Sequence, residues 1–149
     1  MIFIGNYTSK LDTAKGRTAI PAKFRRLFGK KAIITQGFEK SLILVKESDW
    51  EQVTNQVSNA SFLTGVARQT ERFLLGSAFE IDPDAQGRFI IPQALRKYAG
   101  LGKDLVFVGV GNRVEIWDEK AWNNQQRYLA QNIAEISEKL DERISQADR

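Results

Sequence analysis

The 149-residue chain has no cysteine and no histidine, and these two absences exclude several kinds of site. Without cysteine there is no disulfide bond and no thiolate metal ligand. Without histidine there is no imidazole base, and the common zinc sites that combine histidine with other ligands are also excluded. An enzyme mechanism would have to depend on carboxylates, so we expect no enzyme, no metal and no cofactor.

Proline and long apolar runs are also scarce. Three prolines argue against extended disorder, and no apolar run is long enough to span a membrane. The first ten residues, MIFIGNYTSK, lack the basic start and the long apolar stretch of a signal peptide. We therefore expect a soluble, cytoplasmic protein that has no membrane partner and no small-molecule substrate.

Basic residues are concentrated near the N-terminus. Residues 1–75 carry 12 basic and 6 acidic side chains, whereas residues 76–149 carry 10 and 12. Between Ser9 and Lys31, Asp12 is accompanied by eight basic residues: Lys10, Lys15, Arg17, Lys23, Arg25, Arg26, Lys30 and Lys31. This density predicts a surface that binds a polyanion, although a run of charge can also be a solvated face.

An internal repeat is the strongest pattern in the sequence. Residues 71 positions apart match in order: Gly5/Gly76, Gly16/Gly87, Arg17/Arg88, Ile20/Ile91, Pro21/Pro92, Arg25/Arg96 and Gly29/Gly100. One residue is then inserted near Leu101–Gly102, and the matches continue at a separation of 72 as far as Trp50 and Trp122. Because the two tryptophans occupy equivalent positions, packing is a better interpretation for them than base stacking.

Each copy predicts the same succession of short elements. The expected strands are 3–7, 17–20, 32–35 and 41–45 in the first copy, and 78–81, 88–91, 105–108 and 113–117 in the second. A short helix is expected from each proline, over 21–28 and 92–99, and a glycine ends each helix. Apolar residues at helical spacing predict that each helix buries one face.

One copy has too few elements to bury a core, whereas two copies paired about a pseudo-twofold axis could do so. We therefore expect one intertwined domain, divided into a first repeat (1–57), a connecting helix (58–75), a second repeat (76–122) and a helical tail (123–149). The connecting helix is expected to begin at about Ala60. The tail carries a narrow apolar stripe that requires a partner in this domain or in a neighbouring subunit: Leu129, Ile133, Ile136 and Leu140.

The twin GR-x-x-IP elements, the segment RQTERFLLGSAFE and the segment DAQGRFIIPQALRKYAGL resemble the MraZ family of bacterial transcriptional regulators, over nearly the whole chain. The resemblance implies an α+β, mainly β fold: a duplicated AbrB-like swapped-hairpin barrel with short helices, a connecting helix and a C-terminal helix. It also implies regulation of the cell-division and cell-wall gene cluster. The implied partners are double-stranded DNA, at short repeats upstream of the operon, and other subunits in a ring, which gives a nucleoid-associated location.

The resemblance further implies an Asp-x-x-x-Arg motif in each half. Asp84 and Arg88 fit this spacing, whereas Asp12 lies five positions before Arg17, as it would in a loop one residue longer. Gly16 and Gly87 precede the arginines and leave room for a close approach of the backbone. They support the motif together with the two aspartates.

Arginine suits DNA because its planar fork can pair with guanine O6 and N7 or with a phosphate. We expect groove contacts from Arg17 and Arg88, each of which could also, or instead, pair with the aspartate of its own turn. Phosphate contacts, which position a protein without reading the sequence, are expected from Lys10, Lys15, Lys23, Arg25, Arg26, Lys30 and Lys31.

Two alternatives stay open at this level. The basic first half could carry the electrostatic role by itself, or both turns could face DNA with the second reading shape more than charge. The same fold could also serve an antitoxin-like or scaffold protein that acts through protein partners.

Overall fold

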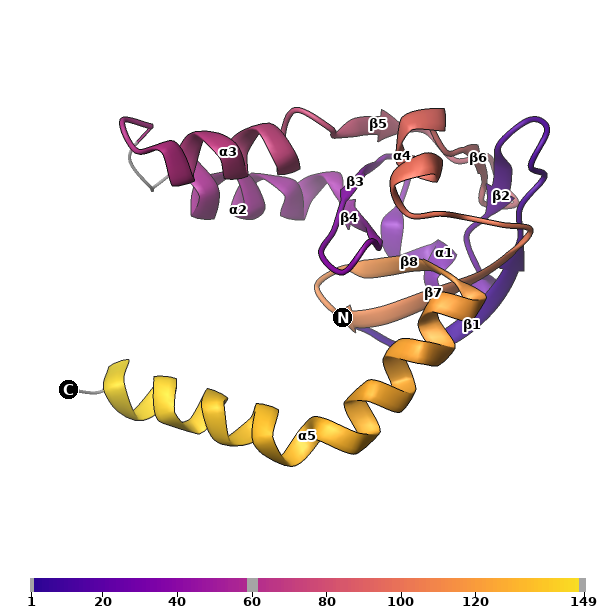
Figure 1. Cartoon of the computed structure of the whole chain (residues 1–149). Helices are drawn as coiled ribbons and strands as arrows, with labels where there is room; N and C mark the ends of the chain where they lie inside the picture. Colours follow the sequence, from indigo (N-terminus) through magenta and orange to yellow (C-terminus); the bar gives the residue numbers. More distant parts are fainter. Residues whose placement is uncertain (1, 59–61, 148–149) are drawn as a thin grey trace. The chain divides into compact units, whose positions relative to one another are not determined.

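The computed structural model describes residues 2–58 and 62–147, and within them eight strands and five helices follow an order that repeats once (Figure 1). The first copy contains β1 (Phe3–Lys10), β2 (Arg17–Ala19), α1 (Ala22–Phe28), β3 (Ala32–Gln36), β4 (Leu42–Lys46) and α2 (Glu47–Ser58). After α3 (Gly65–Leu74), the second copy contains β5 (Phe79–Ile81), β6 (Arg88–Ile90), α4 (Gln93–Tyr98), β7 (Asp104–Gly111), β8 (Val114–Asp118) and α5 (Glu119–Ala147). Each predicted strand is confirmed to within a few residues.

Strands of the two copies are exchanged in the main sheet. Its order is β1-β7-β8-β4-β3-β5, and every neighbouring pair is antiparallel. Replacing each strand by its repeat equivalent gives the same order read from the opposite edge of the sheet, as a pseudo-twofold axis requires. The remaining strands, β2 and β6, pair with each other as a separate two-stranded ribbon. Because each copy supplies an edge strand to the other, the two copies are intertwined.

The buried core is drawn from both copies. Phe24 and Phe28 of α1 and Leu95 of α4 are at most 5% exposed, which confirms that each short helix buries one face. Phe3 of β1 stacks on Phe28, with ring centroids 4.7 Å apart, and meets Phe24 edge-on at 5.7 Å. Burial of each of these large side chains stabilises the fold by about 1.5–3 kcal/mol.

Both short helices begin one residue later than predicted. Pro21 and Pro92 are N-cap residues with ψ angles of 143° and 142°, so they lie in extended backbone just before the first helical residue. A proline nitrogen has no hydrogen to donate in either position, so the sequence pattern does not distinguish the two. Gly29 and Gly100 follow the helices with φ of +70° and +58°, as expected for glycines that end helices.

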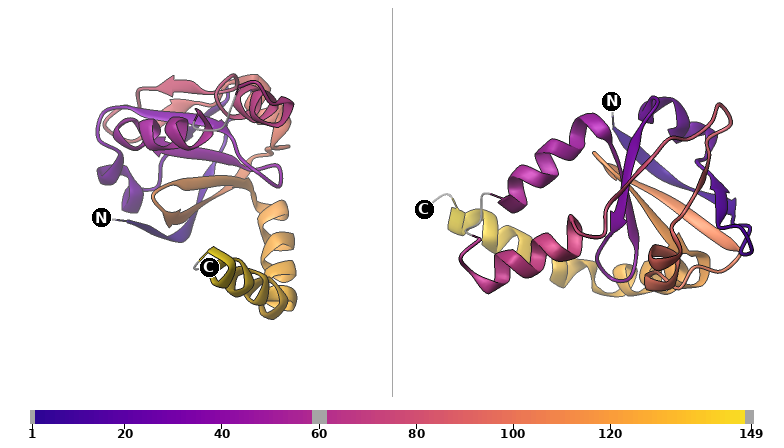
Figure 2. Two further views of the ribbon diagram at one scale, coloured as in Figure 1. Left: turned by 90° about the vertical axis from the view of Figure 1, so that its left-hand side faces the viewer. Right: turned by 90° about the horizontal axis from the view of Figure 1, so that it is seen from above.

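Between α2 of the first copy and β5 of the second, the described residues form one helix, α3. The predicted start of the connecting helix at Ala60 lies outside the described residues. Helix α3 begins at Gly65, because Thr64 is its N-cap and accepts a hydrogen bond from the Ala67 amide at 3.2 Å. Helices α2 and α3 pack against each other (Figures 1 and 2). The C-terminal end of α3 is fixed to the sheet, since the buried Thr35 hydroxyl of β3 donates to the Leu74 carbonyl at 2.6 Å.

Residues 1–119 form one compact unit and residues 120–149 a second, which is described by itself. The second unit contains all of α5 except its first residue; α5 has 29 residues, none of them buried. Of the predicted apolar stripe, Ile133 and Leu140 are 53% and 59% exposed, and Leu129 and Ile136 are half-buried. In the described part of the chain, no helix is both long enough and apolar enough to cross a membrane.

Candidate nucleic-acid interface

The two predicted groove-contacting arginines lie on one face of the β2–β6 ribbon. In this ladder Arg17 is opposite Ile90 and Arg88 is opposite Ala19, so the two arginines are diagonal neighbours on the same face. The backbone positions of such neighbours are about 7–8 Å apart. Both arginines are exposed, whereas Thr18 and Phe89 between them are 3% and 6% exposed. The ribbon lies at the end of its unit away from α2 and α3 (Figure 1).

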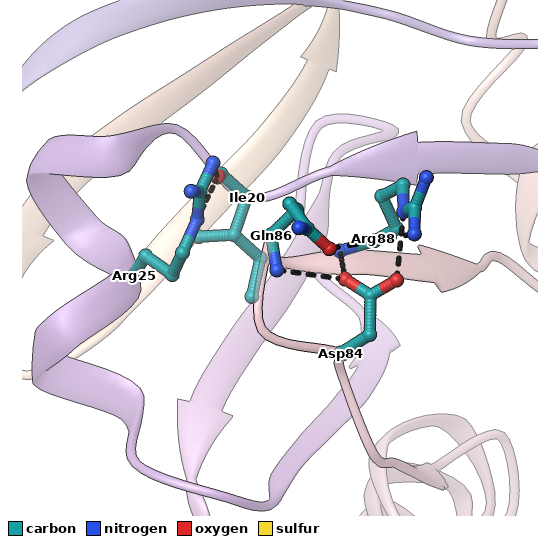
Figure 3. A network of polar contacts seen from close by, with 5 residues as sticks. All are labelled: Ile20, Arg25, Asp84, Gln86 and Arg88. Atoms are coloured by element: carbon teal, nitrogen blue, oxygen red, sulfur yellow. Dashed lines mark hydrogen bonds and ion pairs between the residues drawn. The ribbon is translucent and has the colours of Figure 1, made fainter.

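The second turn is organised by the Asp84 carboxylate (Figure 3). Its Oδ1 accepts hydrogen bonds from the amides of Gln86, at 3.0 Å, and Arg88, at 2.9 Å. Its Oδ2 accepts from Arg88 Nε at 2.7 Å, which forms an ion pair. The Arg88 amide, followed by the Arg88 side chain, lowers the pKa of this carboxyl from its ordinary value. Asp84 therefore fixes both the turn and the direction of the arginine.

The first turn has the same backbone with one more residue. The Asp12 amide donates to the Arg17 carbonyl at 2.8 Å, as the Asp84 amide donates to the Arg88 carbonyl at 3.1 Å. Asp12 therefore occupies the backbone position of Asp84. Its carboxylate Oδ1 accepts from the amides of Ala14, at 3.0 Å, and Lys15, at 3.2 Å.

The two arginines differ in what holds their side chains. Among the described residues, the Arg17 guanidinium has no hydrogen bond and no ion pair, whereas that of Arg88 is bound to Asp84. Arg17 and Arg88 line one surface hollow of about 480 Å³, and the acidic residues of that hollow are Glu80, Asp82 and Asp84. The first turn consequently presents a free cation, and the second presents one that is partly neutralised.

Other basic side chains are distributed over several surfaces. Lys15 lies in the first turn and is exposed, as are Lys23 and Arg26 on α1. Lys10, at the end of β1, forms an ion pair with Asp104, which raises the pKa of Lys10 and lowers that of Asp104. Lys30 and Lys31 line a different hollow, together with Lys46. The structure therefore brings together fewer of these residues than their spacing in the sequence predicts.

Arg25 and Arg96 occupy equivalent, half-buried positions on α1 and α4. Each donates to the carbonyl of the isoleucine that precedes its own helix: Arg25 to Ile20 at 3.1 Å from Nη2, and Arg96 to Ile91 at 2.9 Å from Nε. Sequence reasoning assigned Arg25 to phosphate contact and gave Arg96 no site role. The match of the two positions in the repeat was the available signal.

Within residues 2–58 and 62–147, no three acidic residues are grouped so that they could hold a metal ion.

Comparison with known proteins places the chain among bacterial regulators. The family model described as "MraZ protein, putative antitoxin-like" matches twice, over residues 2–73 and 74–144. A transcriptional regulator MraZ of Carboxydothermus hydrogenoformans is 39% identical over 93% of this chain and 96% of its own length. Proteins of the same name from Syntrophomonas wolfei and Bifidobacterium longum are 37% and 36% identical, over 93% and 99% of this chain and 96% and 95% of their own lengths. With two tandem copies of the domain and relatives that match it over nearly its full length, the chain belongs to the MraZ family, a family of transcriptional regulators and not of enzymes.

Proposed function

We propose that this chain is a sequence-specific DNA-binding transcriptional regulator that acts on the cell-division and cell-wall gene cluster. The observation that carries the proposal is the outward pair of Arg17 and Arg88 on one ribbon, each at the end of an aspartate-stabilised turn. Two arginines on one face can reach neighbouring base edges or phosphates of the same duplex. Such a protein would work in the cytoplasm, associated with the nucleoid.

The finer description of the fold also belongs to this proposal. The exchange of β1 and β5 between copies supports a duplicated AbrB-like swapped-hairpin barrel. The division into repeats at 1–57 and 76–122, joined through 58–75 and followed by a tail at 123–149, is proposed with it. In this arrangement the two DNA-facing turns are related by the pseudo-twofold axis, as Thr18 and Phe89 are in the ladder.

The proposed contacts follow the charge of each position. Arg17 would read a base edge, since its fork is unpaired among the described residues, and Arg88 would contact the groove in the orientation that Asp84 sets. Lys15, next to the first turn, and the exposed Lys23 and Arg26 would contact phosphates. Lys10 would exchange its ion pair with Asp104 for a phosphate.

We also propose that the protein assembles into a ring-like homo-oligomer through α5. The exposed apolar residues of this helix support a buried face in an assembly. Several subunits would then engage successive DNA repeats together, and avidity would exceed the affinity of one subunit.

A labelled duplex taken from the DNA upstream of the chain's own operon tests the proposed function. Fluorescence anisotropy titrations compare it with a scrambled duplex of equal length at one salt concentration. We expect a preference of at least about 1,000-fold for the upstream duplex. Equal affinities for the two duplexes would contradict sequence-specific regulation.

A protein-binding role is the second candidate, because the matching family model is described as antitoxin-like. Phe62, in the turn before α3, and Val66, in its first turn, are 69% and 80% exposed and offer apolar contact surface. The same titrations separate the candidates, since a role through protein partners alone predicts no preference for the upstream duplex.

A further inference from the structure

Arg25 of the first copy lies directly against the turn of the second copy. A Cβ atom added to Gly87 would lie 2.6 Å from Arg25 Nε and 3.3 Å from Arg25 Cδ. Ile20 links the two groups, because its carbonyl accepts from Arg25 Nε and Nη2, at 3.3 and 3.1 Å, and its amide donates to the Gly87 carbonyl at 2.8 Å. Figure 3 shows Arg25 and Ile20 beside the turn of Asp84, Gln86 and Arg88.

Arg96 of the second copy repeats this arrangement against the turn of the first. A Cβ atom at Gly16 would lie 2.7 Å from Arg96 Cζ. Arg96 Nε donates to the Ile91 carbonyl at 2.9 Å, and the Ile91 amide donates to the Gly16 carbonyl at 2.9 Å. Arg96 Nη1 also donates to the Thr13 carbonyl, within the first turn, at 3.4 Å.

The contacts therefore cross between the copies, and they do so twice. Gly16 and Gly87 are buried although they lie in exposed turns, because a guanidinium covers each. Each glycine also has a positive φ, +75° and +78°, so its backbone conformation and its lack of a side chain are both needed. The residue after each glycine is the arginine that we propose for the DNA groove, so a shift of the glycine moves that arginine.

We propose that Arg25 and Arg96 are positioning residues for DNA recognition, each holding the DNA-facing turn of the opposite copy. Arg25 sets the turn that carries Arg88, and Arg96 sets the turn that carries Arg17. This inference rests on the proposed function, and it gives Arg25 a different role from phosphate contact. Two of the nitrogen donors of Arg25 are committed to Ile20, whereas its neighbours Lys23 and Arg26 are exposed.

The first experiment needs no DNA. Arg25→Lys keeps the charge but loses the planar fork, and Arg26→Lys is the matched control on the same helix. Amide chemical shifts of the free protein should change around Gln86–Arg88 in the Arg25 variant and not in the control, while the Asp12–Arg17 turn changes less. Arg96→Lys should give the mirror result, with the larger changes at Thr13–Arg17. Changes confined to the variant's own copy would overturn the crossed contact.

Binding measurements then test positioning against phosphate contact. Arg25→Lys should lower affinity for the upstream duplex about tenfold and leave the log–log salt slope within about 0.3 of wild type, because no phosphate contact is lost. A phosphate contact instead predicts that lysine replaces arginine with little loss, and that Arg25→Ala reduces the slope by about 1. That second result would overturn the positioning role.

A double-mutant cycle supplies a readout that general destabilisation would not move. Arg88→Ala should lower affinity for the upstream duplex about tenfold in the wild-type background and less than about threefold in the Arg25→Lys background. The loss is smaller in the second case because a displaced Arg88 already makes a weaker contact with DNA. Arg17→Ala should lower the affinity equally in both backgrounds. In the Arg96→Lys background, the loss from Arg17→Ala should instead become small, and the loss from Arg88→Ala should stay at its wild-type size. Coupling within one copy, or equal coupling to both arginines, would overturn the inference.

The experiments distinguish a failure of the proposed function from a failure of the positioning role. If the wild-type protein prefers no duplex, the proposed function and the positioning role both fall, and the amide shifts still decide whether the crossed contact exists. If the wild-type protein prefers its duplex but the cycle shows no crossed coupling, only the positioning role falls. Thermal unfolding of every variant identifies any loss of folded protein, and Arg25→Gln, which keeps one donor nitrogen, replaces a variant that does not fold.

Discussion

Thr18 lies directly opposite Phe89 in the β2–β6 ladder, and the two are equivalent residues of the repeat. Their side chains are 3% and 6% exposed, so both point into the core. Because alternate residues of a strand point to opposite faces, this burial directs Arg17 and Arg88 outward. The pseudo-twofold relationship thereby places two equivalent arginines on one surface.

Arg17→Ala should reduce discrimination between the upstream duplex and the scrambled duplex by about 1–3 kcal/mol. The reason is that the unpaired guanidinium of Arg17 is the proposed base contact. Lys23→Ala is the control, since an exposed lysine on α1 should contact phosphates and lower both affinities equally. Anisotropy titrations with both duplexes measure the two effects. Equal losses from Arg17→Ala on both duplexes would remove it from base readout.

Asp84→Asn should weaken discrimination up to about fivefold, the range expected for an exposed ion pair, because Arg88 Nε loses its charged acceptor. Asp12→Asn is the matched change in the other turn, where the carboxylate binds only the amides of Ala14 and Lys15 among the described residues. It should raise affinity for both duplexes slightly and equally. The same preference in both variants would show that the ion pair does not orient Arg88.

Gly109→Ala should destabilise the fold by about 1–3 kcal/mol or more through overpacking. An added Cβ atom would lie 2.5 Å from the Ile4 nitrogen and 2.6 Å from the Phe3 carbonyl carbon, so β1 would have to move away from β7. Gly65→Ala, at the start of α3 where the nearest atom is 3.9 Å away, should change stability by less than about 0.5 kcal/mol. Urea unfolding measures both free energies. Similar midpoints for the two variants would contradict the close β1–β7 approach.

Stability and operator affinity should be nearly constant from pH 6 to pH 8, because the chain has no histidine and the resolved pKa shifts point away from neutrality. Hydrogen bonds lower the pKa of Asp84 and Asp104 from 3.8, so their contribution is complete above that value and is lost as the pH falls through the lower folded value. Asp104 raises the pKa of Lys10 from 10.5, so that contribution is complete below 10.5 and is lost only above it. Affinity measured at pH 6, 7 and 8 should vary less than about twofold from these groups. A tenfold change would show that a group other than Lys10, Asp84 and Asp104 titrates in this range.

The purified protein should be larger than a dimer in light scattering, since a long helix with exposed apolar side chains gains by burying them. Replacing both Ile133 and Leu140 by serine should lower the measured mass and the advantage of multi-repeat over single-repeat DNA. Ala134→Ser, an exposed change on the same helix, should leave both unchanged. A mass near 16.9 kDa with equal affinity for one-repeat and three-repeat duplexes would contradict the assembly.

The repeat, the eight strands and the two short helices could be predicted from the amino-acid sequence alone. These depend on local signals, such as alternating apolar residues, a proline before a helix and a glycine after it, and each signal acts within a few residues. The resemblance to the MraZ family also lies in linear motifs, and the family comparison confirms it. Residues 62–64, which the sequence pattern includes in the connecting helix, are not helical, because Thr64 supplies the cap that begins α3 at Gly65.

Which of the basic residues lie close together depends on the tertiary structure. Lys30 and Lys31 are close to Arg25 in the sequence but line a different hollow, and Lys10 is paired with a residue 94 positions away. The difference between a free Arg17 and a held Arg88 depends on how each turn closes, because one extra residue changes which amides reach the aspartate. In the sequence, Arg25 is one of several basic residues that cannot be told apart. In the folded protein, the exchange of strands places it against Gly87, 62 residues further along the chain. Contacts over such distances arise only when the two copies fold around a common core, because neither copy can bury its apolar residues without the other.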